Sequence, residues 1–353
     1  MFVGGGTLGH ILPIVPVLKM LRENNPQIKA YFIGTTKGLE KNLIESTNLF
    51  TQTFYFDSQG FKRKFSFDNI ITLYKYFKNY FLSRKLLKRL RPAMVVGMGG
   101  YVSGAVVKAA VALKIKTVIH EQNSVYGFTN KVLRKKVDKV LLSYDIESND
   151  KTFLVGNPRI SEIYYLFRDQ IKPVNERALL AVGGSRGAEK INDLIIGLKD
   201  KFKSKDIKVI LITGSKYYKE NIKNINAVRD ESFIVKSFVS NLPELLLKVR
   251  VVVTRCGATT ISEIMALKKV CLFIPSPNVT DNHQEKNAMV IVSKGAAWML
   301  KEAEMNQENL FDMIFELMEN KELRNKIINN LNLITDITAC RKFVDQLNGL
   351  IDK

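Results

Sequence analysis

Three glycine-rich turns each follow a short apolar run and precede a helical pattern, an arrangement typical of phosphate or sugar binding. They span residues 4–9, 97–104 and 183–188 of the 353-residue chain. Glycine lets backbone N–H groups approach a ligand closely, and the N-terminus of a helix favours an anion. The third turn adds the hydroxyl of Ser185, which suits a diphosphate, but it lacks the Lys-Ser/Thr ending of a Walker A loop.

The first turn also matches a dinucleotide-binding pattern, because Gly4, Gly6 and Gly9 read as G-x-G-x-x-G. That pattern needs an acidic residue after the second strand to hold the ribose. Here the apolar run 30–33 continues into Gly-Thr-Thr, so a nicotinamide-dependent oxidoreductase is the weaker alternative. A tight turn without any ligand also stays open.

Histidine and carboxylate residues of this chain fall beside these turns. The only histidines are His10, His120 and His283, and their spacing matches no zinc motif. Glu263 follows the apolar run 251–254 in the first turns of a helix. A carboxylate there can bind the two hydroxyls of a ribose, or it can serve only to stabilise the helix through its dipole. The segment 281–287, rich in amides, suits a sugar with several hydroxyls or is a solvated loop.

The elements that position these residues form two repeated sets of short apolar runs separated by helical patterns. The runs are 1–3, 30–33, 53–56, 94–96, 117–120 and 139–143, then 179–182, 209–213, 233–235, 251–254 and 270–274. Alternation of this kind predicts an α/β fold with parallel sheets covered by helices on both faces. We expect two doubly wound domains facing a cleft, joined near Gly156-Asn157-Pro158.

Composition and charge limit the environment and the partners. Three cysteines without a metal spacing fit a reduced compartment, and the first residues do not have the pattern of a secretory signal. The net charge is +20, and residues 1–155 hold 24 Lys and Arg against 10 Asp and Glu. A basic first half predicts an anionic partner, either a nucleic acid or a membrane surface.

Residues 61–92 interleave basic and aromatic side chains in one predicted helical region. Such a segment is typical of an interfacial helix, where Lys and Arg meet anionic headgroups and rings enter the interface. The membrane contacts that we predict are Lys75, Phe77, Lys78, Phe81, Arg84 and Lys85. A core helix with a basic outer side is the alternative, and RNA binding is disfavoured because no RRM, KH or zinc-knuckle pattern is present.

Eight segments together resemble the UDP-N-acetylglucosamine:lipid I N-acetylglucosaminyltransferase family of bacterial peptidoglycan synthesis. They are GGGTLGH (4–10), GMGGYVSG (97–104), HEQN (120–123), TNK (129–131), GNPR (156–159), GGSRGA (183–188), TRCGATTISE (254–263) and DNHQEKNA (281–288). The resemblance implies a GT-B fold of two Rossmann-like domains. Residues 1–156 with a C-terminal helix at about 338–353 would bind acceptor and membrane, and 157–337 would bind the UDP-GlcNAc donor.

The family's functional roles carry over to matching positions. Glu263 would bind the UDP ribose, Ser185 the diphosphate, and the backbone at Val239 the uracil. The resemblance implies further donor contacts at Thr7, Leu8, Gly9, Asn123, Arg159, Ala258, Thr259, Thr260, His283 and Gln284. It implies acceptor contacts at Gly99, Gly100, Tyr101 and Ser103.

The family inverts the anomeric carbon, so the MurNAc 4-hydroxyl of lipid I would attack directly and need a base. We expect His10 as that base, because an imidazole titrates near neutral pH, with Glu121 as the alternative. No D-x-D motif follows a strand, so we expect neither a metal nor another cofactor. Other implied features are peripheral attachment to the cytoplasmic face of the membrane, contacts with other cell-wall and division proteins, and no nucleic acid.

Two departures from the family pattern concern the first turn. Leu8 stands where the family has glycine, and its side chain would crowd the loop. Only three residues precede the glycines, fewer than a central strand usually has, so we expect the true start upstream of Met1. A non-catalytic basic binding protein and a transferase using diacylglycerol remain as alternatives, although the first leaves the glycine turns without a purpose.

Overall fold

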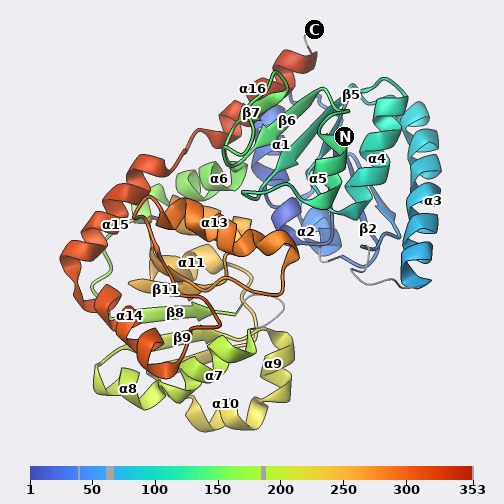
Figure 1. Cartoon of the computed structure of the whole chain (residues 1–353). Helices are drawn as coiled ribbons and strands as arrows, with labels where there is room; N and C mark the ends of the chain where they lie inside the picture. Colours follow the sequence, from blue (N-terminus) through green and yellow to red (C-terminus); the bar gives the residue numbers. More distant parts are fainter. Residues whose placement is uncertain (39, 61–66, 184–187, 352–353) are drawn as a thin grey trace. The chain divides into compact units, whose positions relative to one another are not determined.

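The computed structural model describes the chain except residues 39, 61–66, 184–187 and 352–353. It divides into two compact units, shown in Figure 1. Unit 1 comprises Met1–Glu162 and Asp336–Lys353, and unit 2 comprises Ile163–Thr335. Each unit is built on one sheet whose strands are all parallel. The predicted α/β fold with two doubly wound domains is therefore confirmed.

Unit 1 contains a seven-stranded sheet in the order β3-β2-β1-β4-β5-β6-β7. The strands are β1 (Phe2–Val3), β2 (Tyr31–Thr35), β3 (Gln52–Phe56), β4 (Met94–Gly97), β5 (Lys116–Glu121), β6 (Lys139–Leu142) and β7 (Thr152–Leu154). The order reverses between β1 and β4, and ligands in such sheets bind beyond the carboxyl ends of the strands at this point. Two of the three glycine turns follow these two strands.

The helices of unit 1 cover its sheet, and the last of them comes from the end of the chain. They are η1 (Leu8–His10), α1 (Ile14–Asn24), α2 (Glu40–Thr47), α3 (Phe67–Leu90), α4 (Tyr101–Ala112), α5 (Phe128–Leu133), the start of α6 (Pro158–Phe167), and α16 (Ala339–Ile351). Buried Phe343 and Leu347 of α16 share one core cluster with Ile14 and Leu18 of α1. The C-terminal helix thus completes the core of unit 1.

Unit 2 contains a six-stranded sheet in the order β10-β9-β8-β11-β12-β13, which reverses between β8 and β11. Its strands are β8 (Ala178–Val182), β9 (Lys208–Ile212), β10 (Phe233–Lys236), β11 (Val251–Thr254), β12 (Val270–Phe273) and β13 (Trp298–Met299). Its helices are η2 (Arg168–Gln170), α7 (Glu189–Gly197), α8 (Lys199–Ser204), α9 (Ser215–Glu220), α10 (Ile222–Val228), α11 (Leu242–Leu247), α12 (Ala258–Ala266), η3 (Thr280–Asn282), α13 (His283–Val292), α14 (Gln307–Glu319) and α15 (Lys321–Ile334).

The boundary between the units falls within α6, after Glu162, whereas the sequence places it at residue 156/157. The first turn of α6 is held to the returning segment, because Cys340 N donates a hydrogen bond of 2.9 Å to Ser161 Oγ. Gly156 also lies against Ala339, with φ +78. The start of α6 therefore packs with unit 1.

Candidate functional site

His10 lies in the turn after β1, and its ring is oriented by the backbone of the same turn. Nδ1 lies 3.0 Å from the carbonyl oxygen of Gly5 and 3.2 Å from Thr7 Oγ1. A carbonyl oxygen only accepts, so Nδ1 carries the proton of the neutral ring and Nε2 carries the lone pair. The turn thus fixes Nε2 as the nitrogen that can take up a proton.

The turn after β4 packs directly against the first turn, and only glycine fits there. Gly99 and Gly100 have φ of +107 and +81. A Cβ at Gly99 would lie 2.9 Å from His10 Nε2, and one at Gly100 would lie 2.3 Å from the Gly5 carbonyl oxygen. Both positions therefore exclude a side chain, and the Gly99 backbone borders the basic edge of His10.

The predicted acceptor residues beyond these glycines differ in accessibility. Tyr101 begins α4 and is 43% exposed. Ser103 is fully buried, and its Oγ lies against the Cα side of Gly97. The hydroxyl points into the unit toward β4 and has no hydrogen-bond partner within the described residues, and its predicted contact with the acceptor stays a prediction.

Glu121, the predicted alternative base, is buried and surrounded by hydrogen-bond donors. Its Oε1 accepts from the backbone N and the Nδ2 of Asn123, both at 3.1 Å. Its Oε2 accepts from Gly127 N and Asn130 Nδ2, both at 2.9 Å. The carboxylate therefore holds the loop between β5 and α5, a structural role that competes with service as a base.

Gln122 and His120 form a buried polar chain beneath the second turn. Gln122 Nε2 donates to Met98 O at 2.7 Å and to His120 Nδ1 at 3.1 Å. His120 Nε2 lies 3.0 Å from Ser143 Oγ. Burial lowers the pKa of His120 to about 3, so this ring stays neutral and serves as part of the framework.

Glu40 stabilises the first glycine turn by accepting hydrogen bonds, a role that the sequence does not reveal. The carboxylate is buried, and its Oε1 accepts from Thr35 N at 2.9 Å, from Thr35 Oγ1, and from Gly6 N at 3.4 Å. The sequence shows no acidic residue directly after β2, and the structure places this one at the start of α2. Its spacing from the strand matches no local motif that could have identified it.

In unit 2 the predicted donor residues cluster at the carboxyl ends of β11 and β12. Ala258, Thr259 and Thr260 form the first turn of α12, and buried Glu263 follows on the same helix. The hydroxyl of Thr259 is buried and has no hydrogen-bond partner within the described part of the chain. A buried hydroxyl at a helix N-terminus fits a polar ligand.

Gln284 joins the ends of two strands and thereby fixes its own orientation. Its Oε1 accepts from Cys256 N at 3.3 Å, after β11, and from Ser276 N at 2.9 Å, after β12. Only the amide oxygen can accept from two N–H groups, so the NH2 remains as the donor toward a ligand. His283 precedes it, with Nδ1 2.8 Å from Thr280 O.

The segment before α13 is held in an uncommon backbone conformation. Asp281 and Asn282 have φ of +53 and +51, in the left-handed region that few side chains tolerate. Consecutive residues of this kind often occur at functional sites. Arg255 braces the neighbouring strand ends through Ile274 O and Pro275 O, at 3.2 and 3.1 Å, and pairs with Glu302. This role of Arg255 is not apparent from the sequence.

Arg159, Val239 and Ser185 are predicted to contact the donor in addition to the residues at β11 and β12. Arg159 lies in unit 1 and forms an ion pair of 2.7 Å with Glu162. Val239 is half-buried in the irregular segment that follows β10. Ser185 lies outside the described residues. Thr7, Leu8, Gly9 and Asn123 belong to unit 1, and the remaining predicted donor contacts belong to unit 2.

The described residues form no candidate metal centre. No group of three or more His, Cys, Asp or Glu side chains among them could hold a metal ion. The polar groups of the predicted donor residues are backbone N–H groups, hydroxyls, amides and a carboxylate, which is a set suited to a sugar nucleotide.

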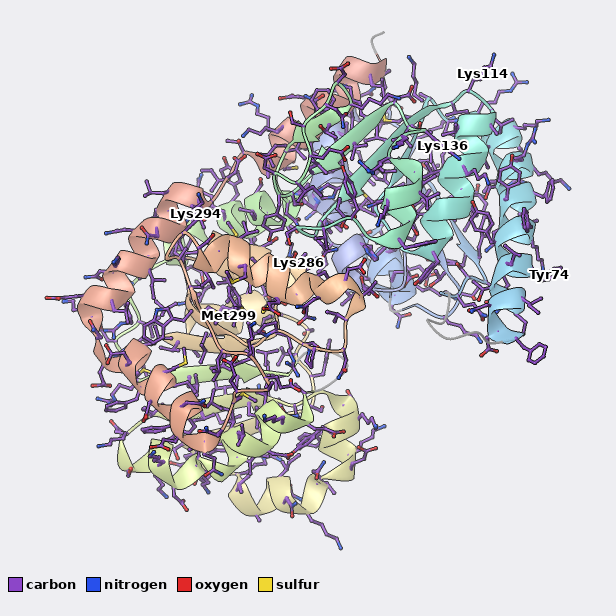
Figure 2. All side chains as sticks on the ribbon, in the orientation of Figure 1. Tyr74, Lys114, Lys136, Lys286, Lys294 and Met299 are labelled. Carbon is purple, nitrogen blue, oxygen red and sulfur yellow. The ribbon has the colours of Figure 1, made fainter. Side chains whose placement is uncertain are left out.

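Helix α3 exposes many large apolar side chains. They are Phe67, Ile70, Ile71, Leu73, Tyr74, Phe77, Phe81 and Leu82, each at least 43% exposed. Figure 2 shows Tyr74 pointing outward from α3. The helix packs along α4 with its opposite side. No helix in the described part of the chain is long and apolar enough to cross a bilayer.

Comparison with known proteins agrees with this division into two units. Residues 1–142 match the glycosyltransferase family 28 N-terminal domain, and residues 178–339 match the family's C-terminal domain. A crystal structure of Acinetobacter baumannii MurG superimposes with a TM-score of 0.75 at 25% identity, covering 99% of this chain and 98% of that one.

Two similar sequences come from Bacillus species. A Bacillus cytotoxicus relative is named UDP-N-acetylglucosamine--N-acetylmuramyl-(pentapeptide) pyrophosphoryl-undecaprenol N-acetylglucosamine transferase. It is 39% identical over 331 residues, covering 90% of each chain. A relative of the same name, numbered 1, from Bacillus thuringiensis subsp. konkukian is 38% identical over 367 residues, covering 99% of this chain and 98% of its own.

Proposed function

This chain belongs to glycosyltransferase family 28, and on this premise we propose that it transfers N-acetylglucosamine from UDP-GlcNAc to the MurNAc 4-hydroxyl of undecaprenyl-diphospho-MurNAc-pentapeptide. The product is the disaccharide-pentapeptide lipid that serves cell-wall synthesis. The relatives' names state the same transferred sugar and the same type of acceptor. Their similarity extends over nearly the whole chain, so both units of the enzyme are included.

The orientation of His10 is the observation that carries the proposed mechanism. The acceptor 4-hydroxyl oxygen attacks the anomeric carbon of GlcNAc while the bond from that carbon to the diphosphate oxygen breaks. The hydroxyl proton passes to Nε2 of His10, whose Nδ1–H stays on Gly5 O. UDP leaves with the bonding electron pair, and the configuration at the anomeric carbon inverts.

Donor binding belongs mainly to unit 2 in this proposal. Glu263 binds the ribose hydroxyls, the NH2 of Gln284 donates to a GlcNAc hydroxyl, and the backbone at Val239 binds the uracil. The diphosphate is stabilised by N–H groups at helix N-termini, by the Thr259 hydroxyl and by Ser185. We propose that these groups act without a metal ion, so activity should persist in excess EDTA.

Release of UDP from UDP-GlcNAc in the presence of a soluble lipid I analogue tests this function. We expect His10→Ala to lower kcat by about 10²- to 10⁴-fold, because the general base is lost. The affinity for UDP-GlcNAc, measured by calorimetry, should stay near the wild-type value. No acceptor-dependent UDP release would refute the proposed function.

His10→Asn is the matched control for the role of the imidazole. Asn can donate to Gly5 O as Nδ1 does, but it has no basic nitrogen. If His10 acts as the base, His10→Asn is as slow as His10→Ala. Recovery of turnover in His10→Asn would show that His10 only positions the turn.

We also propose that α3 attaches the enzyme peripherally to the cytoplasmic face of the membrane. The exposed apolar face of α3 is interspersed with Lys78, Arg84 and Lys85, which suit anionic headgroups. The predicted contact Lys75, in contrast, is mostly covered and is ion-paired with Asp57. Attachment there would bring unit 1 to the layer that contains its lipid acceptor. The support is the combination of aromatic and basic side chains on one helix.

Flotation with anionic vesicles at low salt tests the attachment. The double variant Phe77→Ser/Phe81→Ser should remain mostly unbound, because two large exposed rings no longer enter the interface. Leu333→Ser, which changes an 84% exposed side chain in unit 2, is the control and should float like the wild type. Equal flotation of all three proteins would contradict the role of α3.

A further inference from the structure

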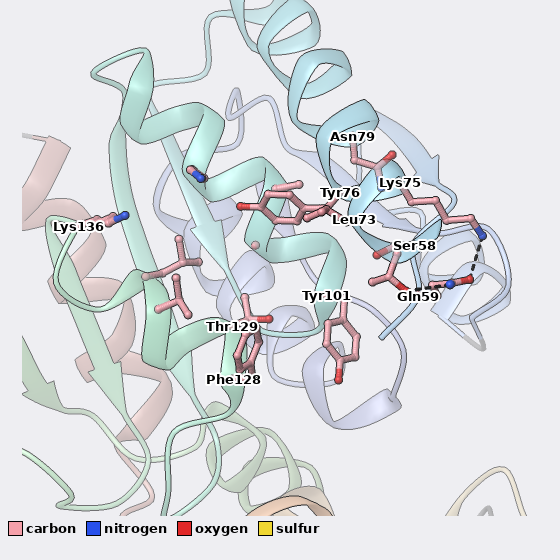
Figure 3. Close-up of a pocket in the computed structure, with 16 residues that line it drawn as sticks. Ser58, Gln59, Leu73, Lys75, Tyr76, Asn79, Tyr101, Phe128, Thr129 and Lys136 are labelled. Carbon is pink, nitrogen blue, oxygen red and sulfur yellow. Dashed lines mark hydrogen bonds between the residues drawn. The ribbon is translucent and has the colours of Figure 1, made fainter. Parts of the chain in front are cut away.

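A pocket in unit 1 lies between α3, α4 and α5 and is separate from the groups that carry the transfer chemistry. Figure 3 shows Tyr76, Tyr101 and Phe128 around it, contributed by α3, α4 and α5. Its cavity volume is about 190 Å³, and it opens to solvent. That space suits a few carbon units of a chain rather than a whole drug-sized ligand.

The absence of a side chain at Gly104 creates part of this space. Gly104 is the fourth residue of α4, and a glycine inside a helix weakens it by about 1 kcal/mol relative to alanine. A Cβ at this position would lie 3.3 Å from Thr129 Cγ2 and 3.6 Å from the Tyr76 ring. A longer side chain here would therefore enter the pocket.

The lining of the pocket suits a chain that is apolar with an anionic end. Aliphatic and aromatic side chains supply much of the lining, and Lys108 and Lys136 add two exposed cations. Lys75 also lines the pocket, but it is ion-paired with Asp57 at 2.9 Å. The described residues that line it include no carboxylate. A cationic ligand is therefore disfavoured, and an anionic amphiphile is favoured.

The pocket is continuous with the turn that borders His10. Thr129, which lines it, donates from Oγ1 to Gly100 O at 3.3 Å. Tyr101 also lines the pocket and follows Gly100 directly. From His10 the path thus leads over Gly99 and Gly100 into the apolar space.

At its other side the pocket meets the exposed apolar face of the unit. Leu73, Phe128 and Val132 line the pocket and are also 47%, 58% and 52% exposed. A chain lying in the pocket could therefore continue into a bilayer touching α3 and α5. The path from His10 has the order of sugar, diphosphate and apolar chain found in the proposed acceptor.

We propose that this pocket binds the first isoprene units of the acceptor's polyprenyl chain, next to the diphosphate. This inference rests on the proposed function and deepens it by assigning a site to the lipid part of the substrate. The enzyme then holds part of the chain itself, in addition to docking on the membrane. The diphosphate lies at the turn of Gly99 and Gly100, and Gly104 provides the room for the chain.

Calorimetric binding of geranyl diphosphate to the whole protein without vesicles tests the pocket independently of turnover. We expect it to bind at least about tenfold more tightly than inorganic diphosphate, because ten carbons leave water, with a negative heat-capacity change. Gly104→Leu should abolish this gain. Gly349→Leu is the matched control, since nothing lies within 4 Å of a Cβ at that helical glycine.

Gly104→Ala covers the case in which the leucine variant does not fold, because it adds only one methyl group and favours the helix. It should fold and bind geranyl diphosphate more weakly than the wild type. Equal binding by wild type and both Gly104 variants would overturn the proposal. Equally tight binding of dihexanoyl phosphatidylglycerol would also overturn it, since the pocket would then accept any membrane lipid.

Turnover of two soluble acceptors separates this inference from the proposed function. The acceptors are diphospho-MurNAc-pentapeptides bearing either a geranyl or a methyl group. We expect a lower KM for the geranyl acceptor in the wild type and equal KM values in Gly104→Leu. Identical KM values in the wild type would refute the pocket alone, whereas no turnover of either acceptor would refute the function and leave the binding measurement to judge the pocket.

Discussion

Backbone hydrogen bonds determine which atom each polar side chain of the site presents. Gly5 O holds the proton on Nδ1 of His10, and two backbone N–H groups hold the oxygen of Gln284. Glu121 is held on both oxygens by the loop it supports. A side chain such as histidine or glutamine can both donate and accept hydrogen bonds, and the neighbouring backbone determines which atom remains to contact a ligand.

Gln284→Glu separates the two functions of this side chain. Glutamate can still accept from Cys256 N and Ser276 N, but it has no NH2 to donate to the sugar. We expect affinity for UDP-GlcNAc to fall about tenfold, as for the loss of a good hydrogen bond, while affinity for UDP stays the same. Calorimetry with both ligands measures this, and a parallel loss for UDP would argue against a contact with GlcNAc.

His120 makes unit 1 sensitive to acid. Its pKa is about 3 in the folded protein, against about 6.5 in an unfolded chain, so below pH 6.5 only the unfolded state takes up the proton. The contribution of His120 to the free energy of unfolding is therefore retained above pH 6.5 and is lost as the pH falls toward 3. Between pH 7 and pH 5 the free energy of unfolding should drop by about 2 kcal/mol from this group.

Urea titrations of the wild type and His120→Gln at pH 7 and pH 5 check this expectation. Glutamine can replace the hydrogen bonds of the ring without titrating, so the variant should lose about 2 kcal/mol less over this interval. An equal loss in both proteins would show that other groups cause the acid sensitivity.

At the scale of elements, the two glycine turns of unit 1 work as a packed pair. The turn after β4 approaches the turn after β1 so closely that the Gly100 backbone touches Gly5. Glu40 and the chain from Gln122 to Ser143 support this pair from below. The position of His10 therefore depends on both turns.

Gly100→Ala and Gly6→Ala distinguish close packing from backbone strain. Both residues have positive φ, which strains an alanine by about 1–3 kcal/mol. Nothing lies within 4 Å of a Cβ at Gly6, whereas one at Gly100 would lie 2.3 Å from Gly5 O. We expect a small loss of stability in Gly6→Ala, and in Gly100→Ala a fall in kcat of more than about tenfold, because a displaced turn misaligns the base.

Thermal unfolding and UDP release of the two variants provide the comparison. Similar kcat values for both would show that the contact between the turns is unimportant for catalysis. Gly104 belongs to the same segment but serves a different purpose, because its φ is helical and its missing side chain opens the lipid pocket.

At the scale of the molecule, the last helix completes the first unit. Phe343 of α16 is fully buried in the core with α1, and its ring meets the edge of His120 at a centroid distance of 5.2 Å. Residues more than two hundred positions apart thus share the core beneath the candidate site. Unit 1 cannot form its complete core until the whole chain is present.

Phe343→Ala should destabilise unit 1 by about 3–5 kcal/mol, the usual cost of removing a buried phenyl ring. Ile351→Ala removes a half-exposed side chain of the same helix and should cost less than about 1 kcal/mol. Calorimetry with and without UDP-GlcNAc identifies the transition of unit 2, which the ligand stabilises. If Phe343→Ala shifts the unfolding transition of unit 2 and leaves that of unit 1 unchanged, the placement of α16 in unit 1 is contradicted.

The sequence by itself determined the central strands, the fold class and the family. Buried parallel strands are short apolar runs between glycine-rich turns, so β4, β5, β8 and β11 are visible in the local pattern. The edge strands β7 and β13 are not, because they are three and two residues long and only partly buried. Motifs such as HEQN (120–123) are also local in the sequence, so they indicated which segments contribute to the candidate site.

Tertiary structure alone decided what each residue of those motifs does. Ser103 turned inward, Glu121 became the support of a loop, and Glu40 reached the first turn from another element. The resemblance implied that the C-terminal helix joins the first domain, but the burial of Phe343 in that core and the pocket between α3, α4 and α5 are invisible in the sequence. Each depends on contacts between residues far apart in the chain, which periodicity and motif spacing do not encode.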